Sequence, residues 1–367
     1  MNQRSARPAG ADRLPSRRAA AACLVAGLVM ASAACSSSGT SASDTAPVSG
    51  GSSSETAASA SASTDKHLNI GYFAFQVQNS YEAPEIAAAK KAAAAQNASL
   101  TVFDANANAQ NQYGQLQDAI VSGKFDGFLV EAVDGAGLVP IVKQALAKHI
   151  KVVGFNTVLG PDLTKQDPQI PGVSAAVVYT AYDRGQHEGK LVEQACATVS
   201  GDCQVGYMYD YKASGFDQGV RSGLDSIIGT NPKIKVVAEG QDSFTASGGL
   251  ASAQQMLQAH PEIDVFVGSD QGMQGTTQAL RAAGKTSQVK IIGLGGSVAG
   301  LEEVESGAWF GEVATLPATQ ATVAVQAITK ALRQGVDSGG INPAAGLPDG
   351  GLVTKANVDK FTGQWNG

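Results

Sequence analysis

From residue 68 onward, short apolar runs alternate with longer segments in which apolar residues recur at helical spacing. This alternation is the pattern of strands joined by crossover helices around a parallel sheet. The runs are apolar on both faces, as expected for strands that helices cover on both sides. An α/β fold is therefore predicted. In the first half the predicted strands are residues 68–75, 99–104, 127–133 and 151–156, and the predicted helices are residues 81–96, 110–122 and 138–148.

The second half of the chain repeats the alternation. Its predicted strands are residues 204–210, 235–240, 264–269 and 289–295, and its predicted helices are residues 216–228, 246–259 and 271–283. Between the halves, the irregular residues 157–172 contain three prolines, and the extended run 173–180 that follows is interpreted as a lobe boundary. The folded region of some 300 residues is near the size at which one core divides, so two lobes are expected. The later elements of the chain can pass between the two lobes. They are a strand-like run (309–316), a helix (317–333), a Gly- and Pro-rich stretch (335–351) and a terminal segment (352–361).

The N-terminal region has the composition of an export leader followed by a tether. Five arginines precede the apolar residues 19–34, which end in small side chains, so residues 1–34 are predicted to be a signal peptide. The apolar stretch falls short of the roughly 20 residues that a membrane span needs. Residues 35–66 are rich in Ser, Ala and Gly and are predicted to be a flexible tether.

Cys35 stands between these two regions, an arrangement that resembles a bacterial lipoprotein leader. That resemblance implies that Cys35 becomes lipidated as the first residue of the mature protein, which would hold the exported chain on the outer face of the cell membrane. The alternative is an ordinary cleaved signal with Cys35 incidental, which would leave the protein secreted or periplasmic.

Charge and cysteine content narrow the partners of the mature protein. The leader removes five arginines and one aspartate, which leaves 21 basic and 31 acidic residues and a net charge of −10. Nucleic acid is therefore not an expected partner. Only Cys196 and Cys203 remain in the folded part, where a short-loop disulfide is favoured in an oxidising compartment. Two unpaired thiols are the alternative, and a zinc site is disfavoured because no histidine lies nearby.

Motifs for catalysis or cofactor binding are incomplete. The Gly-rich segment 291–298 follows a predicted strand, but Val298 stands where a dinucleotide fingerprint needs glycine. Ser297 resembles a nucleophile elbow only faintly, because the last histidine, His260, precedes it, whereas a hydrolase triad needs a later one. The four histidines have no metal-binding spacing. We therefore expect no enzyme activity, no cofactor and no metal.

Polar and aromatic residues follow the predicted strands at their carboxyl ends, where open α/β sheets bind ligands. Aromatic faces can cover the C–H surface of a polyhydroxylated ligand, while amides and hydroxyls bond its oxygens. Core aromatics and helix caps are the alternative interpretation, and for Asp270, directly before a helix, capping is an equal alternative. The candidate ligand-binding residues are Phe75, Gln76, Asn79, Tyr81, Asn156, Thr157, Phe216, Phe244, Asp270 and Gln271.

Several stretches share their order and spacing with one family. They are Asn79-Ser80-Tyr81, residues 185–191, residues 259–266, Asp270 with Gly275, residues 282–285 and residues 314–317. Over residues 68–359 the chain resembles the solute-binding proteins of bacterial sugar importers, the group typified by ribose-binding protein. The resemblance implies two similar lobes linked by a three-strand hinge, with the ligand in the cleft. It places residues 67–180 with 316–346 in an N-terminal lobe and 181–315 with 347–367 in a C-terminal lobe.

The resemblance also implies a function. The protein would be the monomeric binding subunit of an ABC importer, working with a permease and its ATPase. A receptor that serves a membrane sensor is the first alternative, and an exported enzyme on the same scaffold is the second. A sugar-responsive transcription factor would need a basic helix-turn-helix domain in place of the leader.

The pocket of the family carries over only in part. Asn79, Tyr81 and Phe244 fall on an asparagine and two stacking aromatic residues of the family. The pair Asn156-Thr157 replaces an Asp-Arg clamp, Gly295 stands in place of another clamping aspartate, and Thr315, a further candidate ligand residue, replaces a glutamine. Near the family's second-lobe arginine the chain offers Phe216, Gln218 or Arg221, and the alignment does not choose. With the charged clamps largely missing, a neutral sugar, polyol or related small metabolite is expected.

Overall fold

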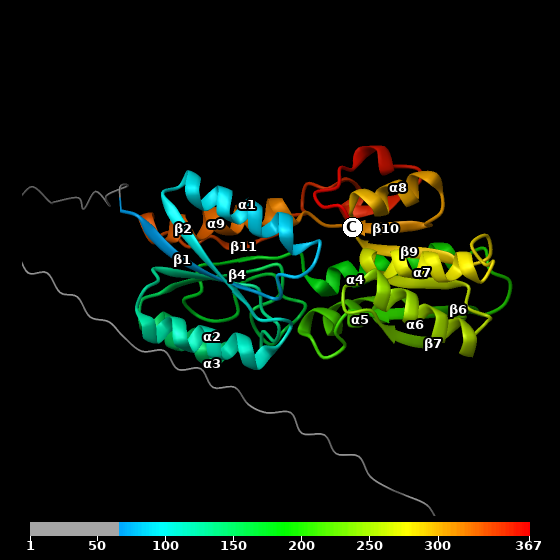
Figure 1. Cartoon of the computed structure of the whole chain (residues 1–367), viewed down its shortest axis with the longest axis horizontal. Helices are drawn as coiled ribbons and strands as arrows, with labels where there is room; N and C mark the ends of the chain where they lie inside the picture. The colour runs from blue at the N-terminus through cyan, green and yellow to red at the C-terminus, as the bar shows by residue number, and fades with distance from the viewer. Residues whose placement is uncertain (1–65) are drawn as a thin grey trace, which may run out of the picture. The chain divides into compact units, whose positions relative to one another are not determined.

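The computed structural model describes residues 66–367. The predicted leader, the predicted lipidation site Cys35 and all of the predicted tether except Lys66 lie outside the described residues. The described part contains two six-stranded sheets, each with helices packed on both faces (Figure 1). None of its helices is both long and apolar enough to span a bilayer.

The first sheet has the strand order β11-β5-β4-β3-β1-β2, and every neighbouring pair is parallel. One face packs on α1 and α9, and the other on α2 and α3 (Figure 1). We call this sheet with its four helices the N-terminal lobe. Its elements are β1 (Leu68–Ala74), α1 (Glu82–Ala95), β2 (Ala98–Asp104), α2 (Ala109–Ser122), β3 (Gly127–Val130), α3 (Val139–Ala147), β4 (Lys151–Phe155), β5 (Ala175–Val177), α9 (Pro317–Gln334) and β11 (Gly339–Ile341).

The second sheet has the order β12-β10-β9-β8-β6-β7, and only β12 runs antiparallel to its neighbour. Helices α4 and α5 pack on one face, and α6, α7 and α8 on the other. We call this sheet with its helices the C-terminal lobe. Its elements are α4 (Ala181–Cys196), β6 (Cys203–Tyr209), α5 (Gly215–Ile228), β7 (Ile234–Gln241), α6 (Ala246–Ala259), β8 (Val265–Ser269), α7 (Asp270–Ala282), β9 (Lys290–Gly295), α8 (Val298–Ser306), β10 (Gly311–Ala314) and β12 (Leu352–Thr354), with short 3-10 turns at Pro348–Gly351 and Val358–Lys360.

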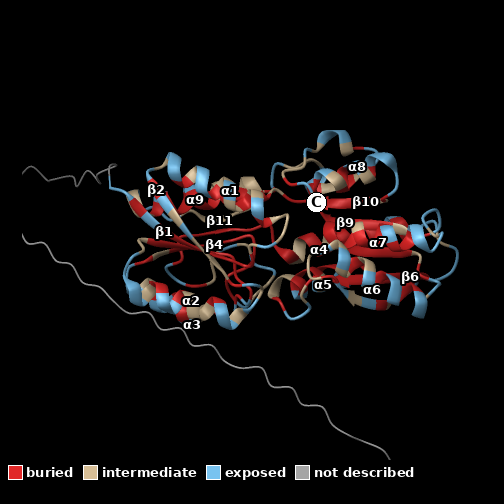
Figure 2. Cartoon of the chain, in the orientation of Figure 1, coloured by how far each residue is buried: buried red, intermediate tan, exposed pale blue. Residues whose placement is uncertain are grey.

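The chain passes between the two sheets three times: from β5 to α4, from β10 to α9 and from β11 to β12. The central strands of both sheets are buried, and the helices are exposed along their outer faces (Figure 2). Strands that are apolar on both faces are buried on both faces, as the sequence pattern requires. The predicted α/β fold with two parallel-sheet lobes is confirmed.

Helix α4 was missing from the predicted elements, and tertiary packing explains why. Its first turns contain Gly185 and Gly189, which lower the helix propensity of an already polar segment. Both glycines face α5, where a side chain on Gly185 would collide with the carbonyl oxygen of Val220. The residues that weaken the local helix signal are therefore the ones that let α4 and α5 approach closely. Strand β3 also ends at Val130, three residues before its predicted end at residue 133.

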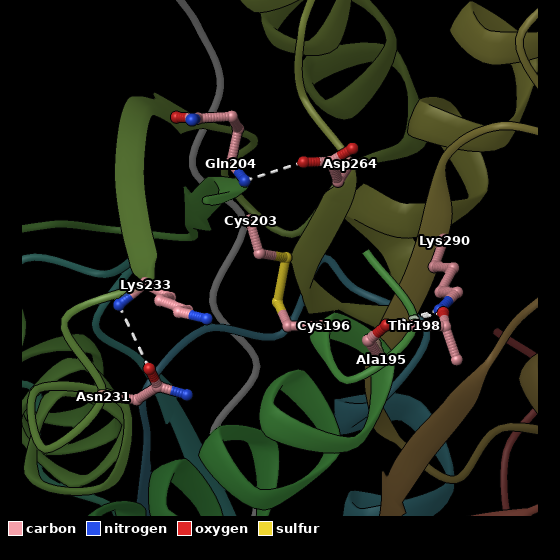
Figure 3. The surroundings of a disulfide bond; sticks show 9 residues. All are labelled: Ala195, Cys196, Thr198, Cys203, Gln204, Asn231, Lys233, Asp264 and Lys290. Atoms are coloured by element: carbon pink, nitrogen blue, oxygen red, sulfur yellow. Dashed lines mark hydrogen bonds between the residues drawn. A yellow bond between two sulfur atoms is a disulfide. The ribbon is translucent and has the colours of Figure 1, made fainter. Parts of the chain in front are cut away.

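Cys196, the last residue of α4, and Cys203, the first residue of β6, form a disulfide with an S–S distance of 2.06 Å (Figure 3). The surrounding backbone is tied down by polar contacts. The Gln204 amide donates to Asp264 over 2.9 Å, and Lys290 donates to the Thr198 hydroxyl over 2.6 Å (Figure 3). The link closes the turn that leads from the first helix of the C-terminal lobe into its sheet.

Candidate ligand-binding site

A cavity with about 520 Å³ of empty space, part of it open to solvent, lies where the carboxyl ends of both sheets meet. The predicted candidates that line it are Phe75, Asn79, Tyr81, Asn156, Thr157, Phe216, Phe244, Gln271 and Thr315. Further lining residues are Glu82, Glu131, Arg184, Ser269, Leu294, Gly295 and Trp365. Both lobes contribute, so a molecule in the cavity touches both at once.

Two predicted candidates, Gln76 and Asp270, do not line the cavity. Gln76 is buried, and its Oε1 accepts a hydrogen bond of 3.2 Å from the Tyr211 hydroxyl of the other lobe. Asp270 is completely buried, and its Oδ2 accepts the Ser297 amide over 2.8 Å. The capping alternative for Asp270 is also wrong, because the Ser269 hydroxyl caps α7. Asp270 instead ties the start of α7 to the start of α8.

Aromatic rings from both lobes form much of the cavity wall. Phe75 follows β1, and its ring centroid lies 6.2 Å from that of Phe244, which follows β7. Phe216, in the first turn of α5, lies 6.2 Å from Phe244 on the other side. Of the three residues that the family alignment left open, Phe216 lines the cavity. Arg221 instead pairs with Asp225 and Glu239, and Gln218 bonds the Ala213 carbonyl.

Two lining residues have left-handed backbone conformations, which non-glycine residues rarely adopt. Asn156 has φ 58° and Phe244 has φ 56°. Hydrogen bonds hold both backbones. The backbone amide of Asn156 donates to the Val177 carbonyl over 3.1 Å, and the backbone amide of Phe244 donates to Asp242 Oδ1 over 2.7 Å. Strained residues persist where surrounding contacts fix them, and they concentrate at functional sites. Here the strain aims an amide and a ring at the same cavity.

Polar side chains supply fixed hydrogen-bonding groups around the rings. Asn79 Oδ1 accepts the Glu82 amide over 2.7 Å at the start of α1. The hydroxyls of Thr157 and Thr315 donate to the backbone carbonyls of Ala132 and Gly295. The buried Nε2 of Gln271 has no acceptor among the described residues. That amide is an unmet donor in the wall, which suits an oxygen of a ligand.

The cavity wall also carries charged groups, which corrects the expectation that charged clamps are missing. Arg184, in the unpredicted α4, is buried and donates to the Tyr179 carbonyl over 2.9 Å and to Asn156 Oδ1 over 3.0 Å. The side-chain nitrogen Nδ2 of Asn156 donates in turn to Glu131 Oε1 over 2.5 Å. Asn156 thus connects a guanidinium to a carboxylate.

Glu131 follows β3 and belongs to a cluster with Glu82 and Glu85 of α1. Carboxylate oxygens of all three lie within 4.8 Å of one another, and all three side chains are buried. Burial raises the pKa of each group, and the nearby Glu131 charge raises the pKa values of Glu82 and Glu85 further. Within the part of the chain that the structure describes, this is the group of acidic residues that could hold a metal ion. The sequence pattern did not indicate this cluster, because its members come from two separate elements.

Trp365 is the other unpredicted wall residue. Its indole is buried, lies 5.4 Å from the Tyr81 ring at 75°, and donates through Nε1 to the Gly295 carbonyl over 3.0 Å. A Cβ on residue 295 would lie 2.5 Å from Cζ2 of the indole. A side chain at position 295 would therefore collide with the indole.

The missed residues differ in the signal that the sequence carried. Glu82 lies in the first turn of the helix predicted for residues 81–96, and Glu131 lies near the end of the strand predicted for residues 127–133, so both could have been included with Tyr81 and Asn156. Arg184 lay in a helix that the pattern did not show, and Trp365 lies 70 residues from its hydrogen-bond partner Gly295. No local pattern could have assigned those two to the site.

Comparison with known proteins identifies the family. Residues 70–335 match the family described as periplasmic binding protein domain, which covers more than half of the chain. The chain belongs to this family. The fold and the cavity between its lobes agree with that membership.

Curated relatives are similar at moderate identity. The chain is 28% identical over 272 residues to the xylitol-binding protein of Mycolicibacterium smegmatis, covering 73% of this chain and 72% of the relative. It is 25% identical over 219 residues to the D-ribose/D-allose-binding protein of Pseudomonas aeruginosa, covering 59% and 66%.

Solved structures share the fold. A myo-inositol-binding protein from Caulobacter, bound to myo-inositol, superposes with a TM-score of 0.70 at 17% identity, covering 81% of this chain and 97% of the other. An ABC-transporter solute-binding protein from Bacillus halodurans with bound myo-inositol superposes with a TM-score of 0.69 at 22% identity, covering 80% and 96%.

Proposed function

We propose that the protein is the extracytoplasmic solute-binding subunit of an ABC importer and that it captures a sugar, polyol or related small metabolite in the cavity between its lobes. The observation that carries the proposal is the wall itself: rings and fixed polar groups from both lobes converge on one cavity. The named relatives bind xylitol, ribose and allose, which are ligands of the size and chemistry that such a wall suits. No catalytic step is proposed.

Ligand binding would couple to lobe closure. Contacts to both lobes form together only when the lobes are closed, so a ligand that makes them stabilises the closed state. We propose hinges near Thr180, Thr315 and Gly346, with residues 67–180 and 316–346 moving against residues 181–315 and 347–367. These positions lie in the three segments that pass between the sheets.

Location and partners are proposed from the leader and the family. Lipidation of Cys35 would hold the monomeric receptor near its permease and ATPase, and residues 36–64 would act as the leash. Mass spectrometry of the mature N-terminal peptide tests this: a lipid on Cys35 is expected, and an unmodified cysteine would remove the anchor but leave the binding function.

The binding function is tested by thermal unfolding of the purified protein with a panel of sugars, polyols and nucleosides. A rise in melting temperature is expected with at least one sugar or polyol, because a ligand that binds only the folded state stabilises it. Stabilisation by charged amino acids alone would contradict the proposal. Mass spectrometry of ligand released from unheated protein would identify the compound directly.

A further inference from the structure

The cavity wall contains more acidic groups than the binding of an uncharged sugar or polyol requires. Glu82 and Glu131 line the cavity, and Glu85 lies directly behind them. Burying a carboxylate without a compensating partner is costly, and three together cost more. A buried carboxyl group either keeps its proton or pairs with a positive charge, and a cation in the cavity would favour the ionised form.

The protein's own donors leave the cluster only partly satisfied. Glu131 accepts the Phe75 amide over 3.1 Å and the Asn156 side chain, and Glu85 Oε1 accepts Gln320 over 2.8 Å. The Oε2 atoms of Glu82 and Glu85 are buried and have no hydrogen-bond donor among the described residues. Glu82 lines the cavity and bonds the Glu131 and Glu85 carboxyl groups while it is protonated; once ionised, it would be an acceptor without a donor.

Arg184 offsets the cluster only in part, because its charge lowers the pKa values of Glu85 and Glu131 without a direct contact. Its Nε and Nη2 donate to the Tyr179 carbonyl and to Asn156, and its guanidinium lies 5.4 Å from the Tyr179 ring and 5.5 Å from the Phe216 ring. Within residues 66–367, no ion pair joins Arg184 to a glutamate of the cluster. One guanidinium thus faces three carboxyl groups, and the wall keeps an excess of acidic groups.

The rest of the wall favours an organic cation over a metal ion. A calcium ion takes six to eight oxygen ligands. Apart from the glutamates, the cavity is lined by the rings of Phe75, Tyr81, Phe244 and Trp365. Aromatic faces attract ammonium groups and cover the apolar surface that carries them.

We infer that the ligand carries an amino group and that Glu82, with Glu131, binds it as an ammonium, so that the site selects an amino sugar or amino polyol. This inference rests on the proposed function and narrows its ligand class. The rings would cover the C–H surface of the ligand, and the free Nε2 of Gln271 would donate to one of its oxygens.

Matched ligand pairs test the inference. Thermal unfolding and calorimetric titration would compare D-glucosamine with D-glucose, D-galactosamine with D-galactose, and an amino-inositol with myo-inositol. At least one amine is expected to bind about tenfold or more tightly than its hydroxyl counterpart, which corresponds to one new charge-assisted contact. Calcium and magnesium chloride would be tested alone.

The variant Glu82→Gln keeps the side-chain length and removes the charge, so it should reduce the amine preference to less than about threefold. Glu312→Gln is the matched control: Glu312 is also fully buried, lies in the C-terminal lobe and does not line the cavity. It should keep the preference. The melting temperature of each ligand-free variant reports whether it folds, and Glu85→Gln replaces Glu82→Gln if that variant does not.

The outcomes separate the two proposals. Neutral sugars that bind as tightly as their amines, or an amine preference that survives Glu82→Gln, overturn the inference and leave the proposed function standing. Stabilisation by a metal salt alone that Glu82→Gln abolishes overturns it in favour of a cation site. If no member of either panel stabilises the protein, both proposals fail.

Discussion

Replacing Trp365 by alanine tests whether the end of the described chain is part of the site. The indole is 3% exposed, and a tryptophan of that burial removes about 150–250 Å² from water. Tryptophan-to-alanine changes in cores cost about 3–5 kcal/mol. Because one side of the indole borders the cavity, water can occupy part of the vacated space. We therefore expect the lower end, a loss of about 3 kcal/mol in the free energy of unfolding.

The same substitution should weaken ligand binding. The ring contributes a stacking face, and losing it should cost about 1.4 kcal/mol, or tenfold in Kd. The segment itself should stay in place, because the amides of Val298 and Ala299 donate to the carbonyls of Trp365 and Asn366, and Gln364 exchanges two hydrogen bonds with Thr319.

Urea unfolding and calorimetric titration with the most stabilising ligand of the panel would measure the two effects. Trp365→Phe is the matched control: it keeps one ring against Tyr81 but loses the bond to the Gly295 carbonyl and the packing of the second ring, so it should cost about 1 kcal/mol for the bond and less in total than Trp365→Ala. If Trp365→Ala unfolds at the same urea concentration and binds as tightly as the natural protein, the indole does not belong to the wall.

Three further predictions concern the site, the disulfide and pH. Phe244→Ala should weaken ligand binding about tenfold in calorimetry without changing the circular dichroism spectrum, and unchanged affinity would remove the ring from the site. Replacing Cys196 and Cys203 by serine should cost about 2.5 kcal/mol of unfolding free energy, from the short loop that they close, and leave affinity unchanged; equal melting temperatures would contradict this. Burial raises the pKa of Asp242 from its ordinary value to about 7, so its folded form prefers the proton and stability falls as pH rises from about 4 to about 7. Asp242→Asn should therefore gain in melting temperature relative to the natural protein across that range, and a constant difference would refute the assignment.

Secondary structure was predictable where local pattern and tertiary role agree. Helix α6 begins and ends where its periodicity places it, and the central strands other than β3 differ from prediction by a residue or two. Helix α4 was not predicted because Gly185 and Gly189 lower its helix propensity and serve its close contact with α5 instead. The three-residue β11 lies inside a Gly- and Pro-rich stretch and becomes a strand only by pairing with β5.

The candidate site was predictable to the extent that it follows strand ends. Asn156 and Phe244 could be placed because the carboxyl ends of parallel strands meet at one edge of a sheet. Gln76 and Asp270 obey the same rule but turn away, because Tyr211 and Ser297 offer them partners. Which way a side chain turns depends on partners that lie far away in the sequence.

The sequence by itself determined the alternation of strands and helices, the two lobes and the edge at which a ligand would bind, because each depends on short-range periodicity and on the direction of parallel strands. Only the tertiary structure decided the chemistry of the wall. It placed Glu82 beside Glu131, connected Arg184 to Glu131 through Asn156, and put Trp365 against Gly295. Charges and rings act through distances of a few ångströms, and the folded chain sets those distances between residues that no local pattern relates.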